Sequence, residues 1–224
     1  MTRENDGTST GVTSDRLESF SDAIFAIAIT LLVLDIGPPK GSGTLWDAML
    51  RQWPSFVAYA LSFLLIGVVW VNHHAVFHLI ARVDLGLLWL NLLLLFDVAF
   101  MPYPTVLLAN ALISNRGQST ATVCYGATLV VGGVLFNATW LHASRHGRLL
   151  HADVAPDTLR AMGRRFVRGP VLCALITPIA LVQVGLTLLG YLVLLAYYGV
   201  AAVREGGSGF GLHHEGRRGE RTGR

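Results

Sequence analysis

Charged residues are scarce in this 224-residue sequence, where they make up 14% of the chain while hydrophobic residues make up 53%. Soluble domains usually carry roughly 25% charged residues. The mean hydropathy of +0.53 agrees with this deficit. The composition excludes an ordinary soluble domain, and its long apolar runs predict an all-α integral membrane protein.

Cysteine is also rare. The chain has two, Cys124 and Cys173, and both lie within apolar runs, where a cysteine behaves as a small hydrophobic residue. No CxxC pair is present. A disulfide framework and a cysteine-based metal site are therefore excluded.

Several functional signatures are missing. There is no P-loop, GxSxG or HExxH motif, so we expect neither an enzyme nor a cofactor. There is no TVGYG-type carbonyl filter, of which Gly190 and Tyr191 form only a fragment. No arginine recurs at every third position through an apolar segment, which excludes a voltage sensor of the usual kind.

Six apolar segments are present that a membrane-spanning helix could occupy. Gly37-Pro38-Pro39 ends the first of them, and the 35-residue run at the end divides at Gln183-Val184-Gly185 into a short hairpin. A kink is expected at Pro102 to Pro104. The predicted spans are 20–36, 54–81, 85–109, 121–143 and the two halves of 169–203.

The segments outside the spans are polar. We expect a flexible tail over 1–15, a six-helix transmembrane domain over 16–203 and a disordered basic tail over 204–224. The long connection over 145–168 is rich in arginine, and its 157–165 portion is predicted to form a short surface helix.

The distribution of cations predicts the topology. If both termini are cytoplasmic, only Lys40, Arg51 and Arg116 of the 17 Lys and Arg residues lie on the outside. Positive residues favour the cytoplasmic side, so the count supports this orientation and also the hairpin. Because these cations flank spans, we expect them to meet the lipid bilayer rather than nucleic acid, despite the net charge of +3.

The first span begins with an unusual polar group. Asp22 stands inside an apolar helix, where a carboxylate costs roughly 2.5 to 3.5 kcal/mol at mid-membrane and less near an interface. It therefore needs partners, and the second span ends in polar residues at the same predicted depth. The candidates are Arg16, Asn72, His73, His74 and His78.

Two interpretations of this polar group remain open. It is either a structural hydrogen-bond network that holds the start of the first helix, or a titratable relay that uses the histidines as a pH sensor. His74 and His78 have the i, i+4 spacing of a transition-metal pair. The sequence places no third ligand, so we predict no metal site.

Helical geometry separates Asp22 from an apolar face of the same span. Ile27, Thr30, Leu31 and Leu34 share one face, and Asp22 lies about 140° from Ile27 at 100° per residue. That face either contacts lipid and neighbouring helices, or it forms rings of large aliphatic side chains that constrict a pore between subunits. If it lines a pore, Asp22 cannot face the lumen.

Three groups of residues resemble a known family. They are Arg16, Phe20, Ser21 and Asp22 as RxxxFSD; Trp70, His73 and Phe77 as W-x-x-H-x-x-x-F; and Asn91 with Pro102 and Pro104. The pattern, over residues 16–105, resembles the first three helices of the endolysosomal transmembrane-175 potassium channel family. The resemblance implies a potassium-permeable channel without a carbonyl filter, whose first helices line the pore on the symmetry axis of an oligomer.

The resemblance also implies roles for individual residues. Ile27, Leu31 and Leu34 would form the pore constriction, and Thr30 would be a hydroxyl layer that affects selectivity. The structural network would comprise Arg16, Ser21, Asp22, Asn72 and His73. A chain with a single six-span repeat is similar to the prokaryotic form, a homotetramer in the cell membrane with K⁺ as its permeant ion. The alternatives are a proton-linked transporter with an Asp22–His73 relay, a channel that also conducts protons, and a non-conducting scaffold.

Overall fold

The computed structural model describes residues 13–209 except 35, 40–42, 146–148 and 153, and the side chains of 158 and 200–209 are not described. Nearly all of the predicted N-terminal tail and residues 210–224 of the C-terminal tail lie outside this part. The described helices are α1 Ser14–Leu34, α2 Leu45–Arg51, α3 Trp53–Phe77, α4 Leu85–Phe100, α5 Pro102–Ser114, α6 Gln118–Arg145, α7 Pro156–Ile176, the 3₁₀ helix η1 Thr177–Leu181 and α8 Val184–Gly209. An isolated bridge between Ile80 and Leu150 joins two loops.

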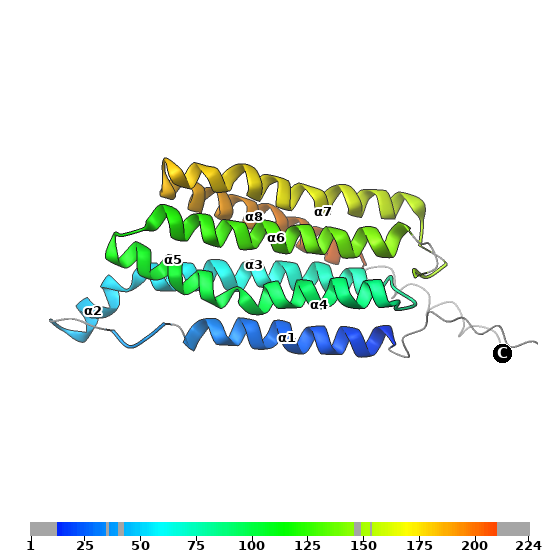
Figure 1. The fold of residues 1–224 in the computed structure, drawn as a ribbon, viewed down its shortest axis with the longest axis horizontal. Coiled ribbons are helices and arrows are strands. Elements are labelled where there is room, and N and C mark those ends of the chain that lie inside the picture. Colours follow the sequence, from blue (N-terminus) through cyan, green and yellow to red (C-terminus); the bar gives the residue numbers. More distant parts are fainter. Residues whose placement is uncertain (1–12, 35, 40–42, 146–148, 153, 210–224) are drawn as a thin grey trace, which may run out of the picture.

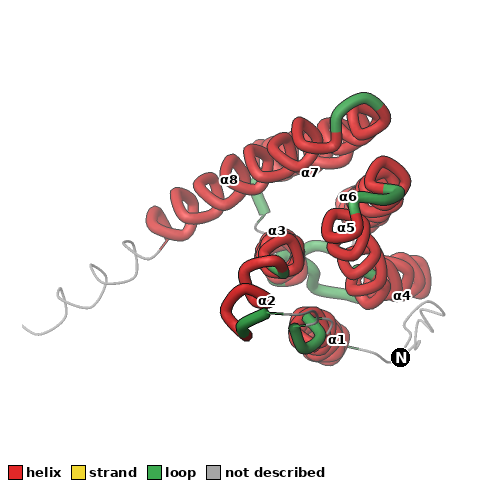
Figure 2. The backbone as a smooth tube through the Cα atoms, turned by 90° about the vertical axis from the view of Figure 1, so that its left-hand side faces the viewer, coloured by secondary structure: helices red, strands yellow, loops and turns green. Residues whose placement is uncertain are grey.

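Helices α1, α3, α4, α6 and α7 run along a common axis (Figure 1), whereas α8 runs obliquely to them (Figure 2). Helix α1 lies at one side of the bundle and α7 at the other, with α3, α4, α5 and α6 between them (Figure 2). Helix α1 packs on α3, α4 and α5, whereas α6 packs mainly on α7 and α4. Helix α1 is therefore a peripheral helix, covered by its own chain on one side.

Four helical segments of the described chain are long and apolar enough to cross a membrane. They are α1, α3, the α4–α5 pair over Leu85–Ser114, and α6. The apolar part of α8, Val184–Gly199, is shorter. Helix α7 does not qualify because its first half carries the arginines of the polar connection.

The predicted break points are present. Helix α5 begins at Pro102, directly after α4 ends, because proline fits the first turn of a helix but interrupts a preceding one. Gln183 separates η1 from α8, as the predicted hairpin requires. The backbone of α8 stays helical to Gly209, so it continues past Arg204, where we expected the disordered tail to begin.

The predicted surface helix over 157–165 is wrong as a separate element. It forms the first half of α7, which continues through Pro170 to Ile176. The Pro170 ring packs on Gly133 of α6, where a Cβ atom would lie 2.8 Å from the ring. The glycine lets α7 approach α6 closely enough to hold the proline-containing segment in line.

The loop predicted over 40–52 contains the short helix α2. Thr44 caps this helix: its hydroxyl accepts from the Asp47 amide at 3.2 Å, and the Asp47 carboxylate accepts from the Thr44 amide at 3.3 Å. This reciprocal arrangement satisfies two amides that a helix start leaves unpaired. The hydroxyl of Thr44 also donates to Asp47 and lowers the pKa of that carboxyl. Trp46 and Trp53 beside it are exposed, as suits an interfacial segment.

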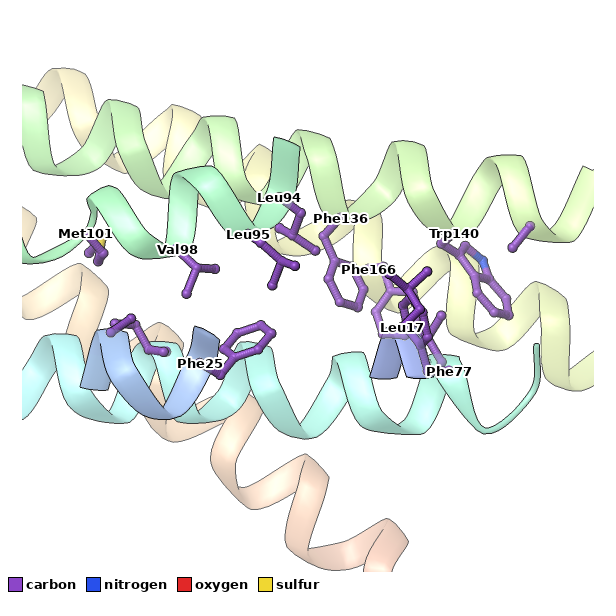
Figure 3. Close-up of a cluster of buried hydrophobic side chains, with 14 of the residues drawn as sticks. Leu17, Phe25, Phe77, Leu94, Leu95, Val98, Met101, Phe136, Trp140 and Phe166 are labelled. Atoms are coloured by element: carbon purple, nitrogen blue, oxygen red, sulfur yellow. The ribbon is translucent and has the colours of Figure 1, made fainter. Parts of the chain in front are cut away.

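One apolar core connects all of the long helices of the bundle. From α1 it includes Leu17, Phe25, Ala28 and Leu32, and these side chains pack with Phe77 and with residues of α4 such as Leu94, Leu95 and Val98. Phe136, Trp140 and Phe166 extend the core between α6 and α7 (Figure 3). The core fixes the rotation of α1, and this rotation decides which of its side chains remain uncovered.

Candidate functional site: the two faces of the first helix

Helix α1 divides into a buried face and an exposed face. Phe25, Ala28 and Leu32 are each 1% exposed, whereas Ile27 is 57% and Leu34 is 74% exposed. The buried residues recur at steps of three and four, as expected for one face of a helix with 100° per residue, and the exposed residues lie on the opposite face.

All four residues of the predicted pore face lie on the exposed side. They are Ile27, Thr30, Leu31 and Leu34. The hydroxyl of Thr30 donates to the carbonyl of Ile27 within the same helix at 2.9 Å. Its oxygen remains on an uncovered apolar face, where it is the polar group of an otherwise aliphatic stripe.

On the buried side, three polar side chains form a hydrogen-bonded chain, and the Nδ1 atom of His73 at its end is buried without a hydrogen-bond partner among the described residues. The Asn91 amide nitrogen donates to Ser21 Oγ at 2.9 Å, and Asn91 Oδ1 lies 2.9 Å from His73 Nε2. Ser21 and Asn91 are fully buried and His73 is 1% exposed. The chain joins α1 to α4 and α4 to α3, so it fixes three helices together at one depth.

The histidine of this chain is held by aromatic rings as well. The His73 ring stacks on Phe77 with centroids 4.2 Å apart, and Phe25 of α1 lies 5.3 Å away on a tilted plane. Because Asn91 Oδ1 can only accept, His73 Nε2 must carry its proton. This contact assigns the tautomer of the ring.

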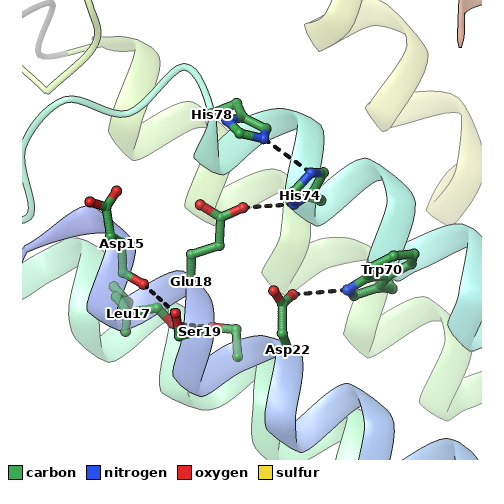
Figure 4. Close-up of polar contacts among 9 residues, drawn as sticks. Asp15, Leu17, Glu18, Ser19, Asp22, Trp70, His74 and His78 are labelled. Atoms are coloured by element: carbon green, nitrogen blue, oxygen red, sulfur yellow. Dashed lines mark hydrogen bonds and ion pairs between the residues drawn. The ribbon is translucent and has the colours of Figure 1, made fainter.

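Asp22 belongs to a separate contact. Its carboxylate accepts a hydrogen bond from Trp70 Nε1 of α3 at 2.8 Å (Figure 4). Trp70 is 38% exposed, so this pair lies at the margin of the α1–α3 interface. The expected partners of Asp22 were the histidines and Asn72, and its described hydrogen bond goes instead to the tryptophan four residues before His74.

The other two residues of the expected network lie elsewhere. Asn72 donates to the carbonyl of Val68 in its own helix at 2.7 Å and lines an apolar cavity of about 150 Å³ between α3, α4, α6, α7 and α8. Arg16 is exposed, and within the described residues its guanidinium has no hydrogen bond or ion pair. The structure thus brings Ser21 and His73 together, places Asp22 beside them, and leaves Asn72 and Arg16 out.

Two residues that make polar contacts at α1 were not predicted from the sequence. Asn91, which figured only in the family pattern, is the central link of the buried chain. Glu18 lies one turn before Asp22, and its carboxylate is 2.7 Å from His74 Nδ1. The four-residue spacing of Glu18 and Asp22 could have identified it, because residues i and i+4 share a helix face.

Comparison with known proteins identifies the family. A model of the family described as endosomal/lysosomal potassium channel TMEM175 matches residues 16–102. A potassium channel of Streptomyces collinus is 46% identical over 188 residues, which are 83% of this chain and 91% of that protein. This chain belongs to the TMEM175 family. The resemblance drawn from the sequence motifs is thereby confirmed.

Other TMEM175 relatives extend the comparison. The crystal structure of a lysosomal potassium-selective channel TMEM175 homolog from Chamaesiphon minutus aligns with a TM-score of 0.75 and 35% identity, over 84% of this chain and 97% of that one. The human endosomal/lysosomal proton channel TMEM175 is 28% identical over 170 residues, which are 71% of this chain and 32% of the human protein. These relatives are ion channels and not enzymes, so this family member is a membrane channel protein, as expected.

Proposed function

We propose that this TMEM175 protein is the subunit of a potassium-permeable cation channel whose pore is lined by the exposed face of α1. In this proposal Ile27, Leu31 and Leu34 form a hydrophobic constriction, and Thr30 supplies a ring of hydroxyls that affects selectivity. The chain has six spans with both termini cytoplasmic, and four copies surround the axis in a prokaryotic cell membrane. K⁺ is the permeant ion, and no cofactor takes part.

The observation that carries the proposal is the one-sided anchoring of α1. Large aliphatic side chains on one face, such as Ile27 and Leu34, are uncovered, yet the other face is fixed by core packing and by the Ser21–Asn91–His73 chain. Interhelical hydrogen bonds of this kind hold a membrane helix at a set rotation, and a pore helix must present the same side chains to the axis in every subunit. The relatives named potassium channels add support.

The proposal is tested by replacing Ile27. In planar bilayers, Ile27→Ala should raise K⁺ conductance and reduce discrimination against Na⁺, because a smaller side chain widens and wets the constriction. Val33→Ala is the matched control: Val33 is 48% exposed on the same helix but lies about 120° from Ile27, so its truncation should leave the currents unchanged. Equal effects of the two variants would overturn the assignment of the pore face.

A proton relay through Asp22 and His73 is the competing function, and the name of the human relative favours testing it. Within the described residues, Asp22 is hydrogen-bonded to Trp70 and His73 to Asn91, and no hydrogen bond links the two. Recordings under a proton gradient separate the functions. A transporter gives saturable, pH-coupled flux, a channel gives unitary currents of K⁺ or of K⁺ and protons, and a scaffold gives neither.

A further inference from the structure

Three ligand-type side chains meet at the end of the bundle where α1 begins and α3 ends. Glu18 comes from α1, and His74 and His78 come from the last turn of α3 (Figure 4). One ligand atom from each, a carboxylate oxygen and two imidazole nitrogens, can be chosen so that all lie within 4.8 Å of one another. We propose that Glu18, His74 and His78 form a binding site for a divalent transition-metal ion of the Zn²⁺ class.

The two histidines are already placed as a metal-binding pair. The backbone remains helical through His78, whose amide donates to the His74 carbonyl at 3.1 Å. Their Nε2 atoms face each other at 3.0 Å. In a tetrahedral site with Zn–N bonds of about 2.0 to 2.1 Å, two nitrogen ligands are about 3.3 Å apart. An ion therefore requires the rings to separate by only a few tenths of an ångström.

Glu18 lies against the other ring nitrogen of His74, where its carboxylate can accept the Nδ1 proton and so orient Nε2 toward an ion. Its Oε1 atom lies 2.7 Å from His74 Nδ1, but both atoms are buried and, within the described residues, neither has a hydrogen bond of acceptable geometry. No lysine or arginine in the described part of the chain forms an ion pair with Glu18. A metal ion held by both histidines would bring positive charge to this carboxylate and satisfy it.

The donor set selects the kind of ion. Two imidazole ligands, one of them backed by a carboxylate, suit Zn²⁺, Cu²⁺, Ni²⁺ and Co²⁺, whereas Ca²⁺ and Mg²⁺ prefer a cage of oxygen atoms. His74 and His78 are accessible from the surface, with His78 exposed, so an ion can enter and water molecules can fill its remaining positions.

The site continues a regular series of contacts between α1 and α3. Asp22 of α1 contacts Trp70 of α3. One helical turn away, Glu18, four residues earlier on α1, contacts His74, four residues later on α3, as expected for two antiparallel helices. A bound ion would fix the last step of this series and clamp the start of α1 to the end of α3. Because the ion binds the folded arrangement, it should stabilise the protein by an amount that rises with the logarithm of the free ion concentration.

The test is Zn²⁺ titration of the metal-stripped, full-length protein in detergent micelles, with calorimetry and the thermal unfolding midpoint as readouts. The wild type should bind one Zn²⁺ per chain at this site and unfold at a higher temperature with Zn²⁺. His78→Asn and Glu18→Gln should each weaken binding by at least about tenfold, since even residues that only support a ligand contribute that much, and should abolish the thermal shift. Without metal, His78→Asn should elute like the wild type because His78 is exposed, and Glu18→Gln should do so because glutamine keeps the size of the side chain.

Two matched variants control for other metal-binding groups. His213→Asn with His214→Asn removes the adjacent histidines of the C-terminal tail, and Asp15→Asn removes an exposed carboxylate three residues before Glu18. Both should keep the wild-type affinity. Wild-type affinity in His78→Asn and Glu18→Gln, or loss of binding in the tail variant alone, would overturn the site. Because neither readout measures conduction, this result is independent of the proposed channel function.

Discussion

The two faces of α1 differ in how their polar groups are satisfied. The hydroxyls of Ser21 and Thr30 both donate to carbonyls of α1 itself. On the buried face, Ser21 also accepts from Asn91 of another helix, which in turn bonds to His73 of a third, whereas the described bond of Thr30 on the exposed face stays within α1. The polar groups of the buried face therefore link α1 to other helices, whereas side chains on the exposed face can change without disturbing the fold.

This difference predicts where substitutions act. Changes on the buried face should lower stability and assembly, and changes on the exposed face should alter conduction in a protein that is otherwise intact. A membrane protein needs this separation if one helix is both to hold the fold and to meet ions, because a pore-facing residue under structural constraint could not be tuned for selectivity.

The largest effect is expected for Asn91→Leu. The substitution keeps a similar volume but removes both described hydrogen bonds that Asn91 makes to α1 and α3. Ser21 still donates to Leu17, but the buried His73 Nε2 proton is left unsatisfied, which costs about 1–3 kcal/mol. Thermal unfolding in detergent should show a large drop in midpoint, and size-exclusion chromatography should show loss of the monodisperse peak. Asn72→Leu is the control, because the described hydrogen bond of Asn72 is to a carbonyl of its own helix. Equal destabilisation by both would show that the Ser21–Asn91–His73 chain has no special role.

An intermediate effect is expected for Trp70→Phe. It removes the hydrogen bond to the Asp22 carboxylate, and a hydrogen bond to a charged group contributes about 1.5–3 kcal/mol. The unfolding midpoint should fall less than in Asn91→Leu because this pair is partly exposed to solvent. Trp89→Phe is the matched control, since Trp89 is 60% exposed and has no described hydrogen bond. A midpoint for Trp70→Phe equal to that of Trp89→Phe would contradict the anchoring role of Asp22.

Sequence reasoning succeeded where the signal is local. The break at Pro102 and the hairpin at Gln183 follow from residues that interrupt helices wherever they occur. The separation of Asp22 from the face of Ile27 follows from the helical step alone. Family motifs added the expectation that Ser21 and His73 act together, which no periodicity could have provided.

The contacts between helices that the sequence did not predict depend on how the helices rotate and approach one another. Whether Asp22 meets a histidine or Trp70 is decided by one turn of register between α1 and α3, and neither helix specifies that register by itself. Asn91 is 70 residues from Ser21 along the chain, so only the packed bundle brings them together. The continuity of α7 likewise depends on Gly133 of a different helix accepting Pro170.

The smallest effect on stability, and the sharpest test of the comparison, is expected for Thr30→Val. The substitution keeps the shape of the side chain and removes a hydroxyl whose described bond is within its own helix. The free energy of unfolding should therefore change by no more than the roughly ±0.5 kcal/mol typical of surface changes, with little shift in the thermal midpoint. In planar bilayers, however, the ratio of K⁺ to Na⁺ permeability should fall, because the pore face would lose the oxygen that replaces part of an ion's hydration shell. Thr30→Ser, which keeps the oxygen, should retain most of the wild-type ratio. A lowered midpoint with an unchanged ratio would place Thr30 on the structural side of the helix and remove the distinction between the two faces.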